Sequence, residues 1–244
     1  MKIRICGTGR ALPAKRVTAS DLDLRLGSGD LVASSGVSTR YLCESESQID
    51  LALAAAEAAL DDADCGLQDI DLIISGAAVP YQPIPSTAPL IMGRLGLGDG
   101  TAAAFDVNAT CLGFVNGLEV ASRMITGGGA RCALIVSSEI ASRALPWDTH
   151  PDVAGLFGDG AAAAVVKSTP PGAESAVAAF HMRTYPSAYD ACGLGAGGTR
   201  FDFQENPADF AVNALFSMNG KDLFRITTQH FTGFVADLLP KAGW

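Results

Sequence analysis

Residues 104–114, which read AFDVNATCLGF, decide the fold of this chain, because they place a cysteine between a strand pattern and a helix pattern. An apolar run typical of a short buried strand precedes Cys111, and apolar residues at helical spacing follow it. A cysteine just inside a helix N-terminus faces unpaired backbone N–H groups and the positive end of the helix dipole. Both favour the thiolate, which is the nucleophilic form of the side chain. The pattern is equally compatible with an ordinary buried cysteine, since a free cysteine behaves as a small hydrophobic residue.

A second motif lies at residues 155–166, which read GLFGDGAAAAVV. A Gly-Asp-Gly turn before an apolar strand is common, so this motif alone says little. Following the Cys111 segment, however, it resembles the condensing enzymes of the thiolase superfamily, and most closely the β-ketoacyl-acyl-carrier-protein synthase III group. Further segments resemble the same group in the same order along the chain, and they lie at residues 7–13, 35–40, 84–88 and 218–224.

Strand and helix patterns alternate along the chain. Strands are expected at residues 3–9, 70–75, 103–108 and 132–137, and helices at 48–65, 86–95 (with Ser86 as N-cap), 111–126 and 220–239. Such alternation predicts an α/β chain with a mainly parallel sheet flanked by helices. The resemblance implies a thiolase-like fold of five αβαβα layers, with the first half complete and the second partial. Residues 1–168 would form the N-terminal half that carries the cysteine, and residues 169–244 the start of the C-terminal half.

The resemblance implies acyl transfer from a CoA or acyl-carrier-protein thioester to Cys111. In the complete enzyme, decarboxylative condensation with a malonyl thioester would follow. The family's Pro-His-Gln-Ala and Asn-Thr-Ser motifs, which stabilise the enolate, do not occur in the 244 residues. We therefore expect a C-terminally truncated enzyme that lacks, by itself, the His and Asn needed for condensation. His150 in a loop, His181 in a strand-like run and His230 on a helix are better explained as structural residues than as substitutes.

The resemblance also assigns binding residues. Five apolar residues are candidates for the wall of an acyl tunnel, although each would equally suit a core position: Ala78, Ile84, Leu156, Phe157 and Met218. Arg225 matches a position where the family often docks its carrier protein, and a solvated helix charge is an equal alternative. A homodimer is expected through the strand near Cys111, with the loop around Ile84 reaching the partner's tunnel. No metal and no cofactor are expected.

Two departures from the family narrow the substrate. Members that start from acetyl-CoA carry Trp and Arg before the Thr-Gly-Ile segment, whereas residues 30–35 here read DLVASS. The loop before Phe157 also lacks the family's Arg. Both departures weaken stacking on adenine and pairing with phosphate. We therefore expect a specialised enzyme of polyketide or other secondary metabolism, or one that uses carrier-bound acyl groups, rather than a housekeeping enzyme of fatty acid biosynthesis.

Composition sets further limits. The formal net charge of −9 argues against binding to nucleic acid, and no apolar run has the length to span a bilayer. The six cysteines form no CxxC pair and no metal-type cluster. They favour a reduced, cytoplasmic setting over a disulfide framework.

Three other functions stay open at this point. An acyltransferase of the same fold would keep Cys111 and acylate an alcohol or an amine without releasing carbon dioxide. A non-catalytic subunit of the same fold would shape a partner's pocket. An unrelated cysteine hydrolase fits least, because the family matches run in order along the chain.

Overall fold

The computed structural model describes residues 1–244, which form two compact units. The first, which we call the sheet unit, comprises Met1–Arg16, Tyr41–Ile140 and Gly158–Val177. The second unit comprises Val17–Arg40, Ala141–Phe157 and Ala178–Trp244. The predicted division into two thiolase-like halves at residues 168 and 169 stays a prediction.

The sheet unit is built on a five-stranded sheet with the order β1-β7-β6-β4-β5. Its strands are β1 (Ile3–Ala11), β4 (Leu72–Ser75), β5 (Ala103–Asp106), β6 (Cys132–Glu139) and β7 (Gly160–Ser168). Strand β4 pairs in parallel with β5 and β6, whereas β7 pairs antiparallel with β1 and β6. Four strands therefore share one direction, as the mainly parallel prediction requires.

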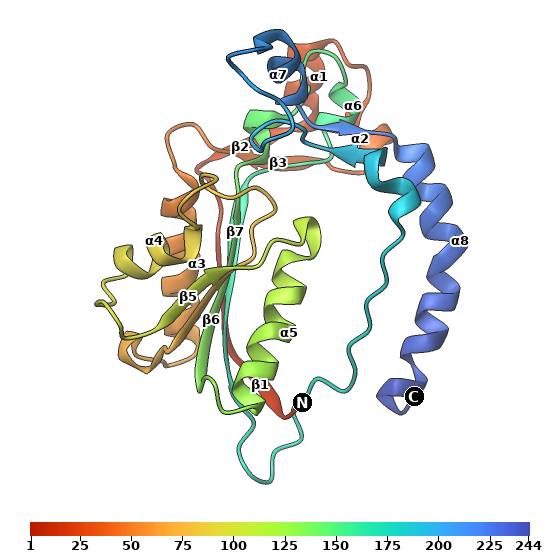
Figure 1. Ribbon diagram of the computed structural model, residues 1–244. Helices are drawn as coiled ribbons and strands as arrows, with labels where there is room; N and C mark the ends of the chain where they lie inside the picture. The colour runs from red at the N-terminus through yellow and green to blue at the C-terminus, as the bar shows by residue number, and fades with distance from the viewer. The chain divides into compact units, whose positions relative to one another are not determined.

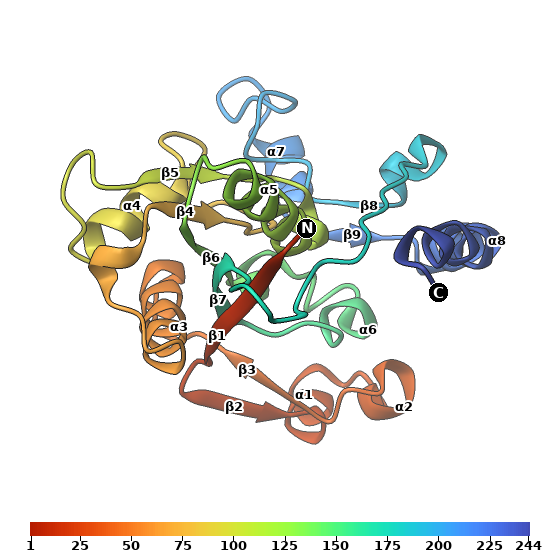
Figure 2. The same ribbon diagram turned by 90° about the horizontal axis from the view of Figure 1, so that it is seen from below.

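Two helices cover opposite faces of this sheet (Figures 1 and 2). Helix α3 (Gln48–Asp62) packs on β1, β7 and β6, and helix α5 (Gly113–Thr126) packs on β4 and β6. Successive residues of β6 are buried on alternating sides, with Leu134 in the core under α3 and Ile135 in the core under α5. A strand covered on both faces needs an unbroken apolar run, which is why the sequence of β6 shows no alternation of polar residues.

Glycine in β1 lets α3 lie close to the sheet. A Cβ atom at Gly9 would lie 2.1 Å from the backbone oxygen of Ala55. The helix itself begins at Gln48 as predicted, with Ser47 and Asp50 forming a capping box. It ends earlier than predicted, at Asp62 rather than near residue 65, because Asp64 turns the backbone into the left-handed region at φ 45°.

The remaining elements are shorter or lie in the second unit. Helices are α1 (Ala19–Leu26), α2 (Leu31–Ser35), α4 (Thr87–Arg94), α6 (Pro151–Ala154), α7 (Pro207–Asn213) and α8 (Gly220–Leu238). Strands β2 (Lys15–Thr18) and β3 (Thr39–Leu42) form one two-stranded sheet, and β8 (Cys192–Gly193) and β9 (Ser217–Met218) form another. Short 3-10 turns lie at Leu67–Asp69, Thr110–Leu112, Ala141–Ala144, Pro186–Ala191 and Pro240–Ala242. None of the helices combines the length and the apolar character needed to cross a bilayer.

Two sequence interpretations need correction. Helix α1 was not predicted, although Thr18 and Asp21 form a capping box before it and Gly27 ends it in the left-handed region. The strand-like run of residues 176–185, which contains His181, is not a strand, because no neighbouring strand completes a ladder with it. Instead, the ring of His181 stacks on Phe234 of α8, with ring centres 4.9 Å apart.

Candidate active site at the Cys111 turn

Cys111 lies in the 3-10 turn Thr110–Leu112, which joins the end of β5 to α5. The predicted helix therefore starts two residues later than expected, at Gly113, and the cysteine stands directly before it. Its thiol is free and exposed. Helix α5 has no side-chain cap and no acidic residue in its first turn. Its N-terminal N–H groups thus have no competing carboxylate within that turn, and its dipole favours a negative charge at this end of the helix.

The residue before the cysteine holds a strained backbone conformation. Thr110 has φ 49°, and only Asp64 shares a positive φ among the residues other than glycine. A β-branched side chain rarely adopts this region, because its Cβ atom crowds the backbone. The Thr110 hydroxyl donates to the backbone oxygen of Ala109 at 2.8 Å. Strain of this kind persists where surrounding structure imposes it, which is common at functional sites.

The turn after β4 packs directly against the turn that carries the cysteine. A Cβ atom at Gly113 would lie 2.1 Å from the backbone oxygen of Gly76, and one at Gly76 would lie 2.7 Å from the carbonyl carbon of Gly113. Two backbones approach this closely only where neither residue has a side chain. The Gly76–Gly113 contact therefore fixes the start of α5, two residues after Cys111.

Glu139, the last residue of β6, holds the turn that follows β4. Its carboxylate accepts hydrogen bonds from the backbone N–H groups of Ala78 and Val79, the latter at 3.4 Å. Burial raises the pKa of the Glu139 carboxyl, and these two N–H groups offset part of the rise. Gln48 adds a second tie, since its Nε2 donates to the oxygen of Val79 at 2.9 Å and to that of Ser138 at 2.7 Å.

Asp106, the last residue of β5, holds the N-terminus of α4. It accepts from the backbone N–H groups of Thr87 and Ala88, both at 2.7 Å. Ser86 occupies the predicted N-cap position but makes no side-chain cap hydrogen bond, because Asp106 takes that role. The sequence analysis missed both Asp106 and Glu139. Their signal is an acidic residue at the carboxyl end of a strand of the parallel part of the sheet, where ligands of open α/β sheets bind.

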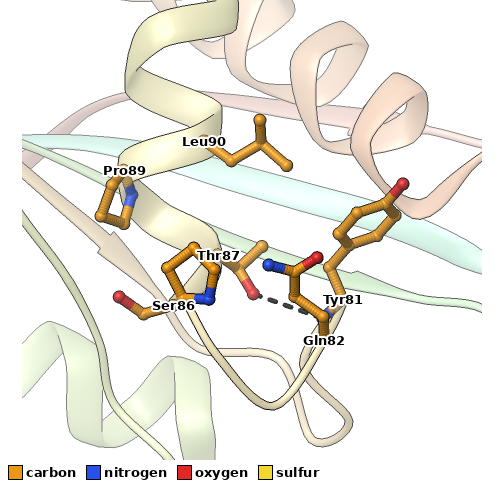
Figure 3. A pocket seen from close by; sticks show the side chains of 7 residues that line it. Tyr81, Gln82, Ser86, Thr87, Pro89 and Leu90 are labelled. Atoms are coloured by element: carbon orange, nitrogen blue, oxygen red, sulfur yellow. Dashed lines mark hydrogen bonds between the residues drawn. The ribbon is translucent and has the colours of Figure 1, made fainter.

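A shallow pocket of about 350 Å³ lies between the loop that follows β4 and the first turns of α4 (Figure 3). Tyr81 and Gln82 line it from the loop, and Pro89 and Leu90 line it from the helix. The Tyr81 N–H donates to the Thr87 hydroxyl at 3.3 Å, which closes the loop onto the helix. Ile84 stands at the tip of this loop and is 86% exposed, so it is not a core residue.

The predicted tunnel residues come from both units. Cys111, Ala78 and Ile84 belong to the sheet unit, and Leu156, Phe157 and Met218 belong to the second unit. Phe157 packs edge-on against Phe216 with ring centres 5.4 Å apart, and Met218 pairs with Cys192 between β9 and β8. Ile84 and Leu156 are exposed, and Ala78, Phe157 and Met218 are half-buried. Their role as a tunnel wall stays a prediction.

Arg225 is exposed on α8 and pairs with Asp222 at 3.3 Å, so its docking role also stays a prediction. The three histidines have local partners. His150 lies 3.1 Å from the Thr149 hydroxyl, His181 contacts Lys241 at 2.8 Å, and the ring of His230 stacks on Tyr185 at 4.2 Å. The structure holds no group of three or more side chains able to bind a metal ion.

Two segments that resemble the family, the Gly-Asp-Gly turn and residues 35–40, each hold a buried charged side chain that binds the backbone. Asp159 of the Gly-Asp-Gly turn is buried and accepts from the backbone N–H of Cys43 at 2.7 Å. The Arg40 guanidinium, also buried, donates to the oxygens of Val37 at 3.0 Å and Gly155 at 2.7 Å. These motifs therefore brace the loops of their own units.

Comparisons with known proteins agree on one family. Residues 105–186 match the family model described as 3-oxoacyl-[acyl-carrier-protein (ACP)] synthase III. The chain is 34% identical over 244 residues to beta-ketoacyl-[acyl-carrier-protein] synthase III 3 of Streptomyces coelicolor, covering 98% of this chain and 71% of that protein. It is also 34% identical to the synthase III of Rhodospirillum rubrum, with 98% and 72% covered. The crystal structure of 3-oxoacyl-(acyl carrier protein) synthase III from Pseudomonas aeruginosa superposes with a TM-score of 0.85 at 29% identity, covering 100% of this chain and 72% of that one.

Proposed function

Because this chain belongs to the β-ketoacyl-[acyl-carrier-protein] synthase III family, we propose that it transfers an acyl group from a CoA or acyl-carrier-protein thioester to Cys111. The observation that carries this proposal is the free, exposed thiol directly before the uncapped N-terminus of α5. A thiolate at a helix N-terminus is the form that attacks a thioester carbonyl. The chain is accordingly an acyltransferase of thiolase-like fold.

In the first step the Cys111 sulfur bonds to the thioester carbonyl carbon, and the carbonyl oxygen takes the negative charge of a tetrahedral intermediate. Backbone N–H groups near the turn would stabilise that oxyanion. The bond to the donor sulfur then breaks, and the donor leaves as a thiolate that takes up a proton from solvent. The Gly76–Gly113 contact and the hydrogen bonds of Glu139 hold the turn in place, so the attacking sulfur loses little freedom in reaching the transition state.

The second step that we propose is condensation of the acyl group with the enolate of a malonyl thioester that has lost carbon dioxide. The 244 residues contain neither the Pro-His-Gln-Ala nor the Asn-Thr-Ser motif that the family uses at this step. An acyltransferase with an alcohol or amine acceptor is the second candidate, because the exposed Cys111 thiol would serve that reaction equally well. The two differ in their products, since only condensation releases carbon dioxide.

We also propose a homodimer that pairs β5 with its counterpart in a second copy. Strand β5 is one of the two edge strands of the sheet and the one near Cys111, and an unpaired edge strand is a template for another strand. The exposed Ile84 would then extend from one copy toward the other's tunnel, and Arg225 would meet an acidic carrier protein. The six free thiols favour a cytoplasmic setting.

Intact-protein mass spectrometry tests the acyl transfer. The protein is incubated with a panel of acyl-CoA and acyl-carrier thioesters, and an increase of one acyl group is expected. Cys111→Ala should lose the adduct. Cys192→Ala is the matched control, because Cys192 is the other exposed thiol and should leave the adduct intact. An adduct that survives in Cys111→Ala, or that disappears in Cys192→Ala alone, contradicts the proposal.

A further inference from the structure

Two buried thiols meet at the other end of the sheet. Cys65 follows α3, Cys132 opens β6, and their Sγ atoms lie 3.8 Å apart although the residues are separated by 67 positions. Both are free, with exposed fractions of 8% for Cys65 and 3% for Cys132. The acyl-transfer chemistry does not involve them, because Cys111 stands at the opposite ends of the parallel strands.

Two charged side chains, Lys167 and Asp69, lie beside the Cys65 sulfur. Lys167 lies opposite Cys132 in the ladder between β6 and β7, and its ammonium group hydrogen-bonds the Cys65 thiol. The Cys65 thiol donates a weak hydrogen bond to the Asp69 carboxylate, with 3.8 Å between Sγ and Oδ2. Burial, together with the neighbouring Cys65, raises the pKa of Cys132 to about 12. The Lys167 ammonium therefore places a positive charge beside the two sulfurs, and burial keeps the proton on Cys132.

We propose that Cys65 and Cys132 form an oxidisable dithiol, which hydrogen peroxide or an organic hydroperoxide converts into an intramolecular disulfide bond. The Cys65 thiolate first attacks one peroxide oxygen, which forms a sulfenic acid and releases hydroxide. The Cys132 sulfur then attacks the Cys65 sulfur, and the sulfenic oxygen leaves as water. In total two thiols and one molecule of hydrogen peroxide give one disulfide and two molecules of water, so both sulfurs are oxidised and the peroxide is reduced.

The local backbone permits the final approach of the sulfurs. They must move closer by about 1.8 Å, since a disulfide bond is about 2.05 Å long. Cys65 lies in the loop that follows α3, between Asp64 and Gly66, whereas Cys132 is fixed in the sheet. Movement of Cys65 toward Cys132 therefore needs less free energy than movement of Cys132, because it breaks no hydrogen bond of the sheet.

The disulfide bond would close a loop that contains the whole Cys111 region. Residues 66–131 include β4, α4, β5, the Cys111 turn and α5. Cross-linking so long a segment removes much of the freedom of the unfolded chain, and the expected gain in melting temperature is roughly 5–15 °C. Oxidation at this pair would thus brace the segment that carries the active cysteine without consuming that cysteine.

The test treats the folded protein with hydrogen peroxide at 25 °C and maps its thiols by non-reducing peptide mass spectrometry. The background is Cys111→Ala, in which the exposed nucleophile is not oxidised. One cross-linked pair of peptides containing Cys65 and Cys132 is expected, with a mass lower by about 2 Da and reversed by dithiothreitol. Cys65→Ser should abolish it. Cys6→Ser is the matched control, because Cys6 is the third thiol near Cys132 and should leave the bond unchanged.

Lys167→Met provides a readout that does not depend on removing a buried cysteine. It should slow formation of the disulfide roughly tenfold, because it removes the positive charge that stabilises the attacking sulfur of Cys65 during the reaction. The proposal is overturned if both thiols stay reduced while the exposed Cys192 is oxidised, or if Cys6 pairs with either of them. It is also overturned if the bond forms only at urea concentrations that unfold the protein.

Discussion

The two ends of the five-stranded sheet hold cysteines in opposite ways. At the carboxyl ends of β4 and β5, Cys111 stands exposed in a turn. At the amino ends of β4 and β6, Cys65 and Cys132 are buried and contact each other through their sulfur atoms. Both residues with a positive φ other than glycine directly precede one of these cysteines, Thr110 at one end and Asp64 at the other.

Acidic side chains hold both ends, but they act on different partners. Glu139 binds N–H groups of the loop that follows β4, and Asp106 binds N–H groups at the N-terminus of α4. Asp71 binds the N–H groups of Arg131 and Cys132, both at 3.0 Å, and so fixes the start of β6. The carboxyl end is thus arranged to present one sulfur to a ligand, whereas the amino end is arranged to exclude solvent from two.

The largest effect is expected where the two turns touch. Gly113→Ala places a methyl group 2.1 Å from a backbone oxygen, so the start of α5 must move. We expect a loss of about 2–4 kcal/mol in the free energy of unfolding and loss of the acyl adduct on Cys111. Urea denaturation and intact mass spectrometry measure the two. Gly93→Ala in α4 meets no atom within 4 Å and should be neutral or stabilising. Equal effects of the two substitutions would contradict the close contact.

The next largest effect is a difference in acylation rate between variants of Glu139 and Asp71, the acidic residues at the two ends of the sheet. Glu139→Ala leaves two backbone N–H groups without their acceptor, which should cost about 1–3 kcal/mol and slow acylation of Cys111 about tenfold. Asp71→Ala removes a comparable clamp, at a similar cost in stability, but it should change the acylation rate by less than about twofold. Single-turnover acylation by rapid quench measures the rates. If Asp71→Ala slows acylation as much as Glu139→Ala does, the two ends are not functionally distinct.

A smaller effect compares the strained backbones. Thr110→Gly should raise the free energy of unfolding by up to about 1 kcal/mol, because release of strain exceeds the entropy cost of glycine. It should also slow acylation, since the turn becomes less rigid. Asp64→Gly should change the free energy of unfolding by only about 0.3 kcal/mol, because aspartate tolerates the left-handed region. Thermal and urea unfolding of both variants decide whether strain is concentrated at the active end.

The smallest effect is an opposite dependence on pH. Partial burial opposes ionisation of Asp71, but hydrogen bonds from Cys132 and Arg131 outweigh it and hold its pKa below 3.8. Its carboxylate therefore stabilises the fold above pH 3.8, and this contribution is lost as the pH falls through the folded-state pKa. Burial raises the pKa of Glu139 above 4.5, so its contribution is present below pH 4.5 and is lost as the pH rises through the folded-state pKa.

The two amide variants isolate these contributions. The cost of Asp71→Asn should shrink when urea unfolding is repeated from pH 7 down to pH 3, whereas the cost of Glu139→Gln should grow. Parallel trends in the two variants would show that the carboxylates occupy similar environments, which would contradict the assigned difference.

The sequence alone predicts those features of the fold that depend on residues close together in the chain. The apolar runs of β4 and β6, the start of α3 at Ser47 and Gln48, and the placement of Cys111 between a strand and a helix all follow from local periodicity and capping. The missed helix α1 has the same kind of local signal in Thr18 and Asp21. The strand expected around His181 failed because a strand depends on a partner, which periodicity does not reveal.

Only the tertiary structure decided which distant residues meet. Glu139 lies 61 positions from Ala78, and Cys65 lies 67 positions from Cys132. Such contacts depend on strand order, on register and on the close approach of Gly76 to Gly113. A side-chain pattern determines which face of an element is buried, because burial acts on each residue separately. It does not determine which buried groups become neighbours, because that follows from how the elements pack together.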